Sequence, residues 1–139
     1  MAVFLNNKVG VKVNSVDLSD HVQSATLTRN FSELDVSAMG DTGVKRIKGL
    51  EDSNVAISFL NDTASASVLA TLQAAWGTNV TVTMLQDKGS AVSATNPLYT
   101  FTALINGTTD INGAVSDLGT IDVTWNISGA TTVATTGTF

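Results

Sequence analysis

The chain of 139 residues contains no cysteine, one proline and one histidine, and only 14% of its residues are charged. The absence of cysteine excludes disulfides and thiolate metal sites. Other metal sites draw on several histidines or clustered carboxylates, and one histidine with scattered acids does not supply such a set. No apolar run approaches the ~20 residues that a membrane helix requires. We therefore expect no metal, no cofactor and no membrane anchor.

The net charge is −5, from seven basic and twelve acidic residues. Because phosphate binding requires a basic face, this balance argues against nucleic-acid binding as the main activity. Residues 1–7 have neither a basic region nor an apolar core, so no secretory signal is expected. A chain with so few charges has a surface rich in Ser, Thr and Asn, or buries part of its surface against copies of itself.

Apolar and short polar residues alternate with a period of two through most of the chain. This pattern predicts strands that have aliphatic or aromatic side chains on one face, at residues 9–13, 22–29, 80–84, 99–105 and 121–127. Two more strands are expected at 34–39 and 55–60, on either side of a long loop. Together these segments indicate an antiparallel sheet with one dry face. No linker divides the chain, so residues 1–139 are expected to form one domain.

One segment, from Thr63 to Trp76, is predicted to be a helix. Asp62 is a suitable N-cap because its carboxylate accepts hydrogen bonds from the free amides of the first turn, and Gly77 supplies the C-terminal stop. One face of this helix is apolar and carries Val68, Leu69, Leu72, Ala75 and Trp76. Such a stripe favours closure of one end of the β core over a cofactor or partner groove. Both tryptophans, Trp76 and Trp125, are expected to be buried.

No group of residues predicts catalysis, and we expect no enzymatic activity. His21 lies beside Asp20, but adjacency in sequence does not give the geometry of a catalytic site, so a solvated or capping role is expected. The acidic pairs Glu51–Asp52 and Asp17/Asp20 are expected to be solvated turn residues. The glycines near residues 40–49 do not match a phosphate-binding loop, because no Gly-Lys-Ser/Thr opens a following helix.

The loop between the strands at 34–39 and 55–60 is the candidate functional segment. It is too long for a tight hairpin and too short for a domain. Its residues are Gly40, Asp41, Thr42, Gly43, Val44, Lys45, Arg46, Ile47, Lys48, Gly49 and Leu50. Three of the seven basic residues and three large apolar side chains lie in it. The residues leave two interpretations open: a solvated loop, or an arm that binds the acidic surface of an identical neighbour.

A series of short motifs extends in a characteristic order along nearly the whole chain. They are Val-Asn-Ser-Val-Asp-Leu-Ser-Asp (13–20), Leu-Asp-Val-Ser-Ala-Met-Gly-Asp (34–41), Gly-Leu-Glu-Asp (49–52), Trp-Gly-Thr (76–78), Thr-Asn-Pro-Leu-Tyr (95–99) and Gly-Ala-Val-Ser-Asp-Leu (113–118). In their order these motifs resemble the major tail tube proteins of long-tailed, siphovirus-type bacteriophages.

The resemblance implies an antiparallel β-sandwich or partly closed barrel with one flanking α-helix. It implies six-fold rings that stack into a hollow tail tube, with residues 40–52 as the loop that reaches the next ring or neighbour. The partners implied are copies of the chain and other tail proteins, with DNA only as transient cargo in the bore. The implied location is the virion tail, assembled in the host cytoplasm. The negative charge of each copy would repel DNA from the wall.

Two other functions remain as alternatives. One is a head-tail connector or tail terminator of the same fold, which forms a single ring and does not polymerise. The other is a carbohydrate- or receptor-binding β-sandwich, a class that usually exposes aromatic side chains in its loops.

Overall fold

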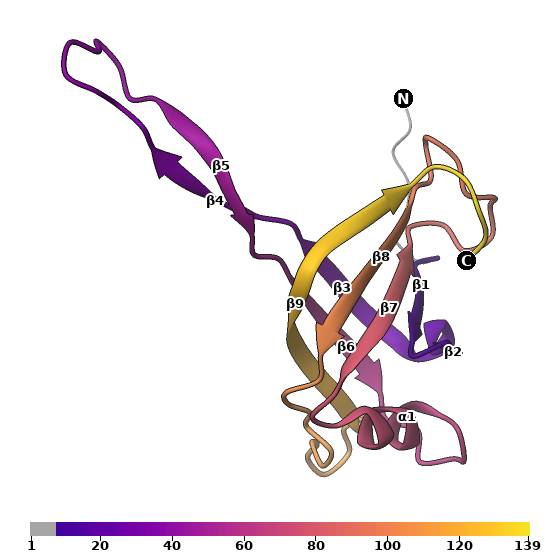
Figure 1. The fold of residues 1–139 in the computed structure, drawn as a ribbon. Helices are drawn as coiled ribbons and strands as arrows, with labels where there is room; N and C mark the ends of the chain where they lie inside the picture. Colours follow the sequence, from indigo (N-terminus) through magenta and orange to yellow (C-terminus); the bar gives the residue numbers. More distant parts are fainter. Residues whose placement is uncertain (1–7) are drawn as a thin grey trace.

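The computed structural model describes residues 8–139 as a mainly β chain with a single α-helix (Figure 1). The expected lack of a secretory signal concerns residues 1–7, which lie outside the described residues. The elements are, in order, β1 (Gly10–Val13), β2 (Val16–Asp17), the 3-10 helix η1 (Ser19–His21), β3 (Val22–Thr28), β4 (Phe31–Asp35), β5 (Arg46–Glu51), β6 (Asn54–Leu60), α1 (Val68–Ala75), β7 (Asn79–Leu85), β8 (Leu98–Leu104) and β9 (Thr120–Ala134).

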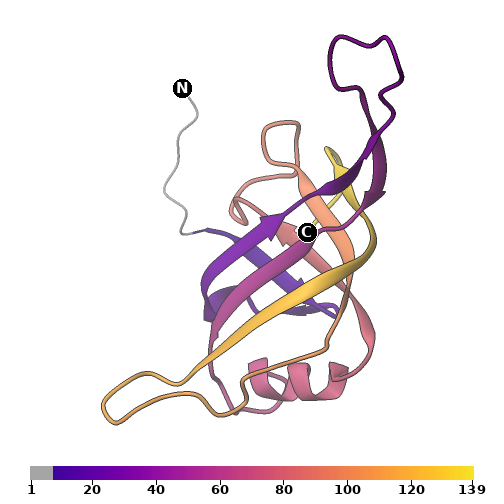
Figure 2. The same cartoon turned by 90° about the vertical axis from the view of Figure 1, so that its left-hand side faces the viewer.

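Seven strands form one antiparallel sheet in the order β2-β1-β7-β8-β9-β6-β3. The sheet curls into a half-barrel, with β1 and β3 on facing sides (Figure 2). The long strand β9 joins the two sides, because residues 120–126 pair with β6 and residues 127–134 pair with β8. A register shift between Thr100 and Thr102 of β8 lies opposite residues 128–132 of β9, just beyond the point where β9 changes partner. The predicted mainly β, partly closed barrel with one flanking helix is confirmed.

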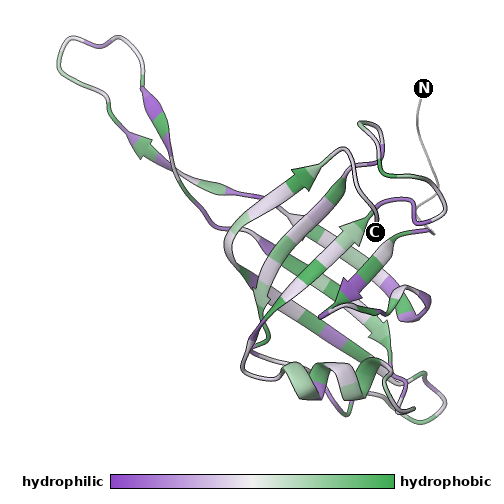
Figure 3. Cartoon of the chain, turned by 45° about the vertical axis from the view of Figure 1, so that its right-hand side comes forward, coloured by the Kyte–Doolittle hydropathy of each residue, from purple (hydrophilic) through white to green (hydrophobic). Residues whose placement is uncertain are grey.

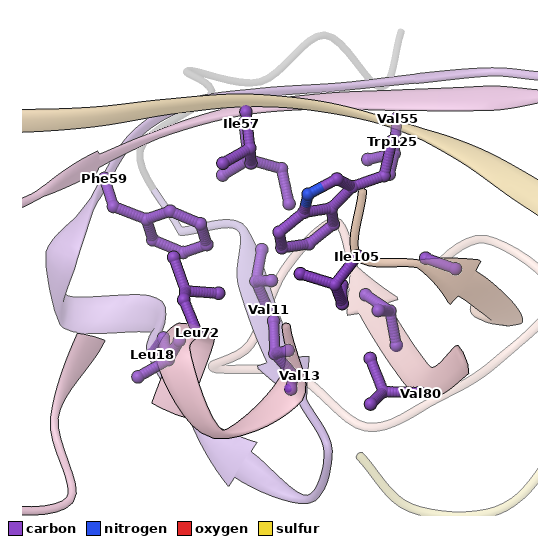
Figure 4. Close-up of a cluster of buried hydrophobic side chains, with 14 of the residues drawn as sticks. Val11, Val13, Leu18, Val55, Ile57, Phe59, Leu72, Val80, Ile105 and Trp125 are labelled. Carbon is purple, nitrogen blue, oxygen red and sulfur yellow. The ribbon is translucent and has the colours of Figure 1, made fainter. Parts of the chain in front are cut away.

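The inward face of the sheet and one face of α1 enclose a single apolar core (Figure 4). Its largest fully buried side chains are Trp125 and Phe59, with Leu18, Leu72, Ile105 and Ile121 around them. The indole Nε1 of Trp125 donates a hydrogen bond to the Gly107 carbonyl at 3.2 Å, so the buried polar atom has a partner. The alternation in the sequence therefore identified the core strands correctly, including the burial of Trp125.

The helix is shorter than predicted. It begins after Ser67, and the expected start at Thr63 is wrong because Ala66 has a positive φ of 59°, which interrupts helical geometry. The Asp62 carboxylate accepts from the Ala64 amide at 2.9 Å and the Ser67 hydroxyl at 2.7 Å, so it orders the turn before the helix. Trp76 follows the last helical residue and is 58% exposed, which contradicts its expected burial.

The predicted loop at 40–49 is also corrected. Arg46 to Glu51 form strand β5, which pairs with β4 in a separate two-stranded sheet. The expected strand at 34–39 begins earlier and ends at Asp35, and β6 pairs with β3 and β9 instead of flanking the loop. The region is a long hairpin whose connecting loop covers residues 36–45.

Candidate inter-subunit interface

Residues 31–52 form a two-stranded hairpin, here called the arm, that projects from one end of the half-barrel (Figures 1 and 2). Its β4–β5 pairing places Leu34 opposite Ile47 and Asp35 opposite Arg46. The five residues of β4 correspond to a reach of about 17 Å at the usual rise of a strand, and the loop at 36–45 extends beyond it. This length places the loop well outside the body of the barrel.

The two faces of the arm differ in character. Because directly opposed residues share a face, Leu34 and Ile47 lie on one side. The pairs Glu33–Lys48 and Asp35–Arg46 alternate with them and lie on the other side. The paired part of the arm therefore has one apolar face and one charged face, and within residues 8–139 no third strand joins this sheet to bury the apolar one.

Seven large apolar side chains of the arm are at least 45% exposed. They are Phe31, Leu34, Val36, Met39, Val44, Ile47 and Leu50. Hydrophobic and hydrophilic positions are interspersed along the projecting hairpin (Figure 3). Single exposed apolar residues are common, but seven of them within one projecting hairpin favour an interaction surface. Four of the seven lie outside the predicted site at 40–50. Three of these four, Leu34, Val36 and Met39, lie in the segment 34–39 that was predicted to be a strand.

The basic residues of the arm are partly neutralised within it. Lys45 Nζ lies 2.9 Å from the Asp41 carboxylate, and Arg46 Nε lies 3.4 Å from Glu33. Lys48 Nζ lies 5.4 Å from the centre of the Phe31 ring. Since the arm has five acids and three bases, its net charge is −2. The sequence predicted a basic loop, but the positive charge is confined to residues 45–48 and the arm as a whole is acidic.

Two hydrogen bonds from backbone amides to side chains stabilise the arm loop. The Ala38 amide donates to the Asp41 carboxylate at 2.7 Å, and this hydrogen bond, followed by the one from Lys45, lowers the pKa of Asp41 below its ordinary value. The Ser37 hydroxyl accepts from the Lys45 amide at 2.7 Å. These contacts close the loop across its base and hold Met39 and Val44 outward.

Gly49 is required for the close approach of the two arm strands. A Cβ at this position would lie 2.8 Å from the Ser32 carbonyl oxygen. At Gly43, by contrast, nothing lies within 4 Å of the corresponding position. A side chain at position 49 would therefore interfere with the pairing of β4 and β5, whereas one at position 43 would not.

The base of the arm is anchored to the barrel. Ser53 is fully buried, accepts from the Asn30 amide at 3.2 Å and donates to Glu51 at 3.2 Å. The Asp52 amide donates to the Asn30 carbonyl at 2.8 Å. Glu51, expected to be a solvated turn residue, also accepts from the Thr131 amide of β9 at 3.3 Å. These bonds fix the direction of the arm.

The other acidic residues and His21 act in local structure. His21 Nε2 lies 3.0 Å from Asp62 Oδ2, the oxygen that also accepts from the Ser67 hydroxyl in the turn before α1. Asp17 lies 2.8 Å from Lys88 Nζ. Partial burial raises the pKa of Asp17, but hydrogen bonds from Lys88 and Ser19 outweigh it and lower the pKa to about 2. Within residues 8–139 no cluster of metal-ligating side chains occurs, and no helix has the length and apolar character to cross a membrane.

The outer edge of β3 is a second candidate contact. Among the described residues, β3 pairs on one side only, with β6. Its sequence, Val-Gln-Ser-Ala-Thr-Leu-Thr, contains no charge and no proline, the residues that usually protect an edge from pairing with another chain. On the facing side, Ser19 and Leu18 already bond to Val11 of β1. The β3 edge is thus suited to receive a strand.

The chain is similar in fold to components of two gene transfer agent (GTA) particles. The first is a chain of the virion of a native GTA particle, with a TM-score of 0.69 and 12% sequence identity, over 95% of this chain and 99% of that one. The second is a chain from the tail of an empty GTA particle with C6 symmetry, with a TM-score of 0.57 and 12% identity, over 81% of each chain. No protein-family model and no curated protein matches the sequence. At this identity the similarity concerns the fold, and it confirms the resemblance to a tail protein at that level.

Proposed function

We propose that this chain is the structural subunit of a hollow tail tube, in which six-fold rings of identical copies stack along one axis. It would lie in the tail of a phage-like particle, together with other tail proteins, and would carry out no catalysis. The observation that carries the proposal is the agreement of fold with a chain from a C6-symmetric tail, over four fifths of both chains. Two exposed surfaces of the subunit support it independently.

The arm is the first of these surfaces, and we assign residues 40–50 and the adjoining β4 side chains to contact between copies. Covering the exposed halves of Leu34 and Ile47 would contribute about 1 kcal/mol each. The arm comprises 22 residues, which is comparable with the about 20–30 residues that each partner contributes to a standard stable interface. Contact with another copy of the chain accounts for the apolar face of the arm without any bound ligand.

The edge of β3 supports closure of a ring. A strand of a neighbouring copy could satisfy its free backbone groups, and repetition around a closed ring would leave no edge exposed. The facing edge is formed by the two-residue strand β2, and Ser19 of η1 bonds to Val11 of β1 beside it, so the two sides of the half-barrel are not equivalent. Unequal edges favour a head-to-tail ring over a two-fold dimer.

Two faces dominated by short polar side chains suit a bore that passes DNA without binding it. Each also includes one charged residue, since Lys12 lies opposite Thr83 and Asp122 shares the outward face of β9. On β7 and β8, Thr81 opposes Thr102 and Thr83 opposes Thr100, so four hydroxyl groups form one patch. On β9, Thr124 and Asn126 face outward from the core. With a net charge of −5 per copy, a ring would repel the DNA backbone rather than hold it.

Electron microscopy of the purified protein over a range of concentrations tests this function. Hollow tubes of stacked rings are expected. Single rings that never stack would identify the chain as a connector or terminator instead. A stable monomer that binds glycans would identify a receptor-binding domain, a rival now favoured by one observation: the exposed Trp76 lines a shallow hollow with Gln73, Thr108 and Asp110.

A further inference from the structure

A second group of exposed apolar side chains lies at the end of the half-barrel opposite the arm. In both views α1 and the loop at 105–119 lie at this end (Figures 1 and 2). The most exposed members are Ile111 and Val115, at 99% and 97%, with Leu118 at 70% and Trp76 at 58%. We call these four side chains the far-end surface. None of them was part of the site predicted from the sequence.

The loop that carries this surface is tied to the barrel. Thr109 Oγ1 accepts from the Asp122 amide at 2.8 Å, and Asn112 Nδ2 donates to the Asp122 carboxylate at 3.1 Å. Asn61 Nδ2 donates to the Asp110 carbonyl at 3.4 Å. Because these bonds fix the base of the loop on β9, Ile111 and Val115 are presented to solvent from a defined position.

The charge at this end is of one sign. Residues 61–79 and 104–120 contain three acids, Asp62, Asp110 and Asp117, and no lysine or arginine. The arm, in contrast, holds three of the seven basic residues of the chain within residues 45–48. The arm as a whole has a net charge of −2, and Lys45 and Arg46 are paired with Asp41 and Glu33. Lys48 has no carboxylate within salt-bridge distance among the described residues, so its ammonium group can meet an acid of the far end while the apolar groups of the two ends pack together.

We infer that the far-end surface is the docking site for the arm of a second copy of this chain. This inference rests on the proposed function and names the surface that receives the arm. Two different patches at opposite ends make a heterologous contact, which repeats in one direction and does not close on itself. Every copy in such a stack extends its arm to one neighbour and receives the arm of the other.

Disulfide cross-linking between engineered cysteines tests the assignment, because the chain has no cysteine of its own. The arm variant is Met39→Cys, at a fully exposed position, combined in turn with Ile111→Cys, Val115→Cys or Leu118→Cys. The matched control combines Met39→Cys with Ala94→Cys, an exposed residue in the loop between β7 and β8 at the arm end of the barrel. Far-UV circular dichroism establishes that each variant is folded.

Oxidation of the assembled protein is expected to give ladders of three or more linked chains for at least one far-end pair, and no ladder for the control. Each single-cysteine variant is expected to stop at dimers. Tubes in which the far-end cysteines form no link and react freely with a maleimide would overturn the inference and leave the proposed function intact. Failure of the unmodified chain to assemble into rings or tubes would overturn both.

Discussion

Leu34 and Ile47 lie directly opposite each other across the two arm strands, and each is about half exposed, at 50% and 53%. The pair would stabilise a core if a third element covered it, but among the described residues the sheet that carries it consists of β4 and β5 alone. In the core of the barrel, by contrast, Trp125 and Phe59 are at 0% exposure. Folding of the single chain therefore buries the apolar face of the barrel sheet but leaves the apolar face of the arm available to a partner.

The first prediction separates these two surfaces. The double substitution Leu34→Ser and Ile47→Ser should leave the melting temperature of the monomer almost unchanged, because both side chains are half exposed and distant from the core. It should raise the concentration needed for assembly at least tenfold, measured by light scattering. The apolar control, Leu34→Met with Ile47→Val, should assemble normally. Equal assembly of the serine variant would show that this face is not an interface.

The second prediction concerns the glycine in β5. Gly49→Ala should disrupt β4–β5 pairing, because the new Cβ would meet the Ser32 carbonyl at 2.8 Å. Amide hydrogen exchange in the arm should accelerate while exchange in β6 to β9 stays slow. Gly43→Ala, at a position with open space around it, is the matched control and should change neither. Unaltered exchange in the Gly49 variant would contradict the close approach.

The third prediction tests the charges of the arm. Reversal of Lys45, Arg46 and Lys48 to Glu should leave the barrel folded but prevent tube growth. Since two of these cations pair with Asp41 and Glu33, the triple variant also loosens the arm. Lys48→Glu alone is the cleaner test and should weaken assembly several-fold, with a partial recovery when it is mixed with the Asp117→Lys variant. Normal tubes from the triple variant would show that the cations are not engaged.

The fourth prediction uses the two tryptophans. Trp76 is 58% exposed and Trp125 is fully buried, so assembly should shift the fluorescence emission to shorter wavelength through Trp76 alone. Trp76→Phe should abolish the shift and leave monomer stability within about 0.5 kcal/mol. Trp125→Phe should preserve the shift but destabilise the fold, since it removes the Gly107 hydrogen bond and leaves a void. An unshifted spectrum in tubes would mean that Trp76 stays in water.

The fifth prediction concerns acid stability. The pKa of Asp17 is lowered to about 2, so between about pH 4 and pH 2 the unfolded chain binds more protons than the folded one. The stabilisation is present above the unfolded pKa and is lost as the pH falls through this window. Asp17→Asn should lower stability at pH 6 and flatten the pH dependence between pH 4 and 2, measured by urea unfolding. An identical slope in both proteins would contradict the assignment.

The sequence predicted the strands of the barrel well because one face of each is buried. The alternations at Val80–Met84 and Ile121–Ile127 have this cause, and both sets are buried in the core. It failed at β5, where Arg46, Lys48 and Gly49 suggested a loop. Both faces of β5 are largely exposed to solvent, so burial does not impose a clear alternation of apolar and polar residues on its sequence. The alternation Arg46-Ile47-Lys48 was the only available signal.

The helix start and the far-end surface were missed for another reason. Asp62 has the chemistry of an N-cap, but its carboxylate is used by the turn at 62–67, a choice fixed by the backbone at Ala66. Ile111 and Val115 lie in a loop, where spacing says nothing about exposure. Their position at the end opposite the arm depends on the curl of the whole sheet, which no local pattern encodes.

The central claim is that copies of this chain stack head to tail into a hollow tube, and cryo-electron microscopy of the concentrated protein tests it most directly. The account predicts tubes with six subunits per ring and an open bore, in which the arm of each subunit contacts the α1 end of a subunit in the next ring. A protein that remains monomeric at every concentration, or rings whose arms point freely into solvent, would contradict it.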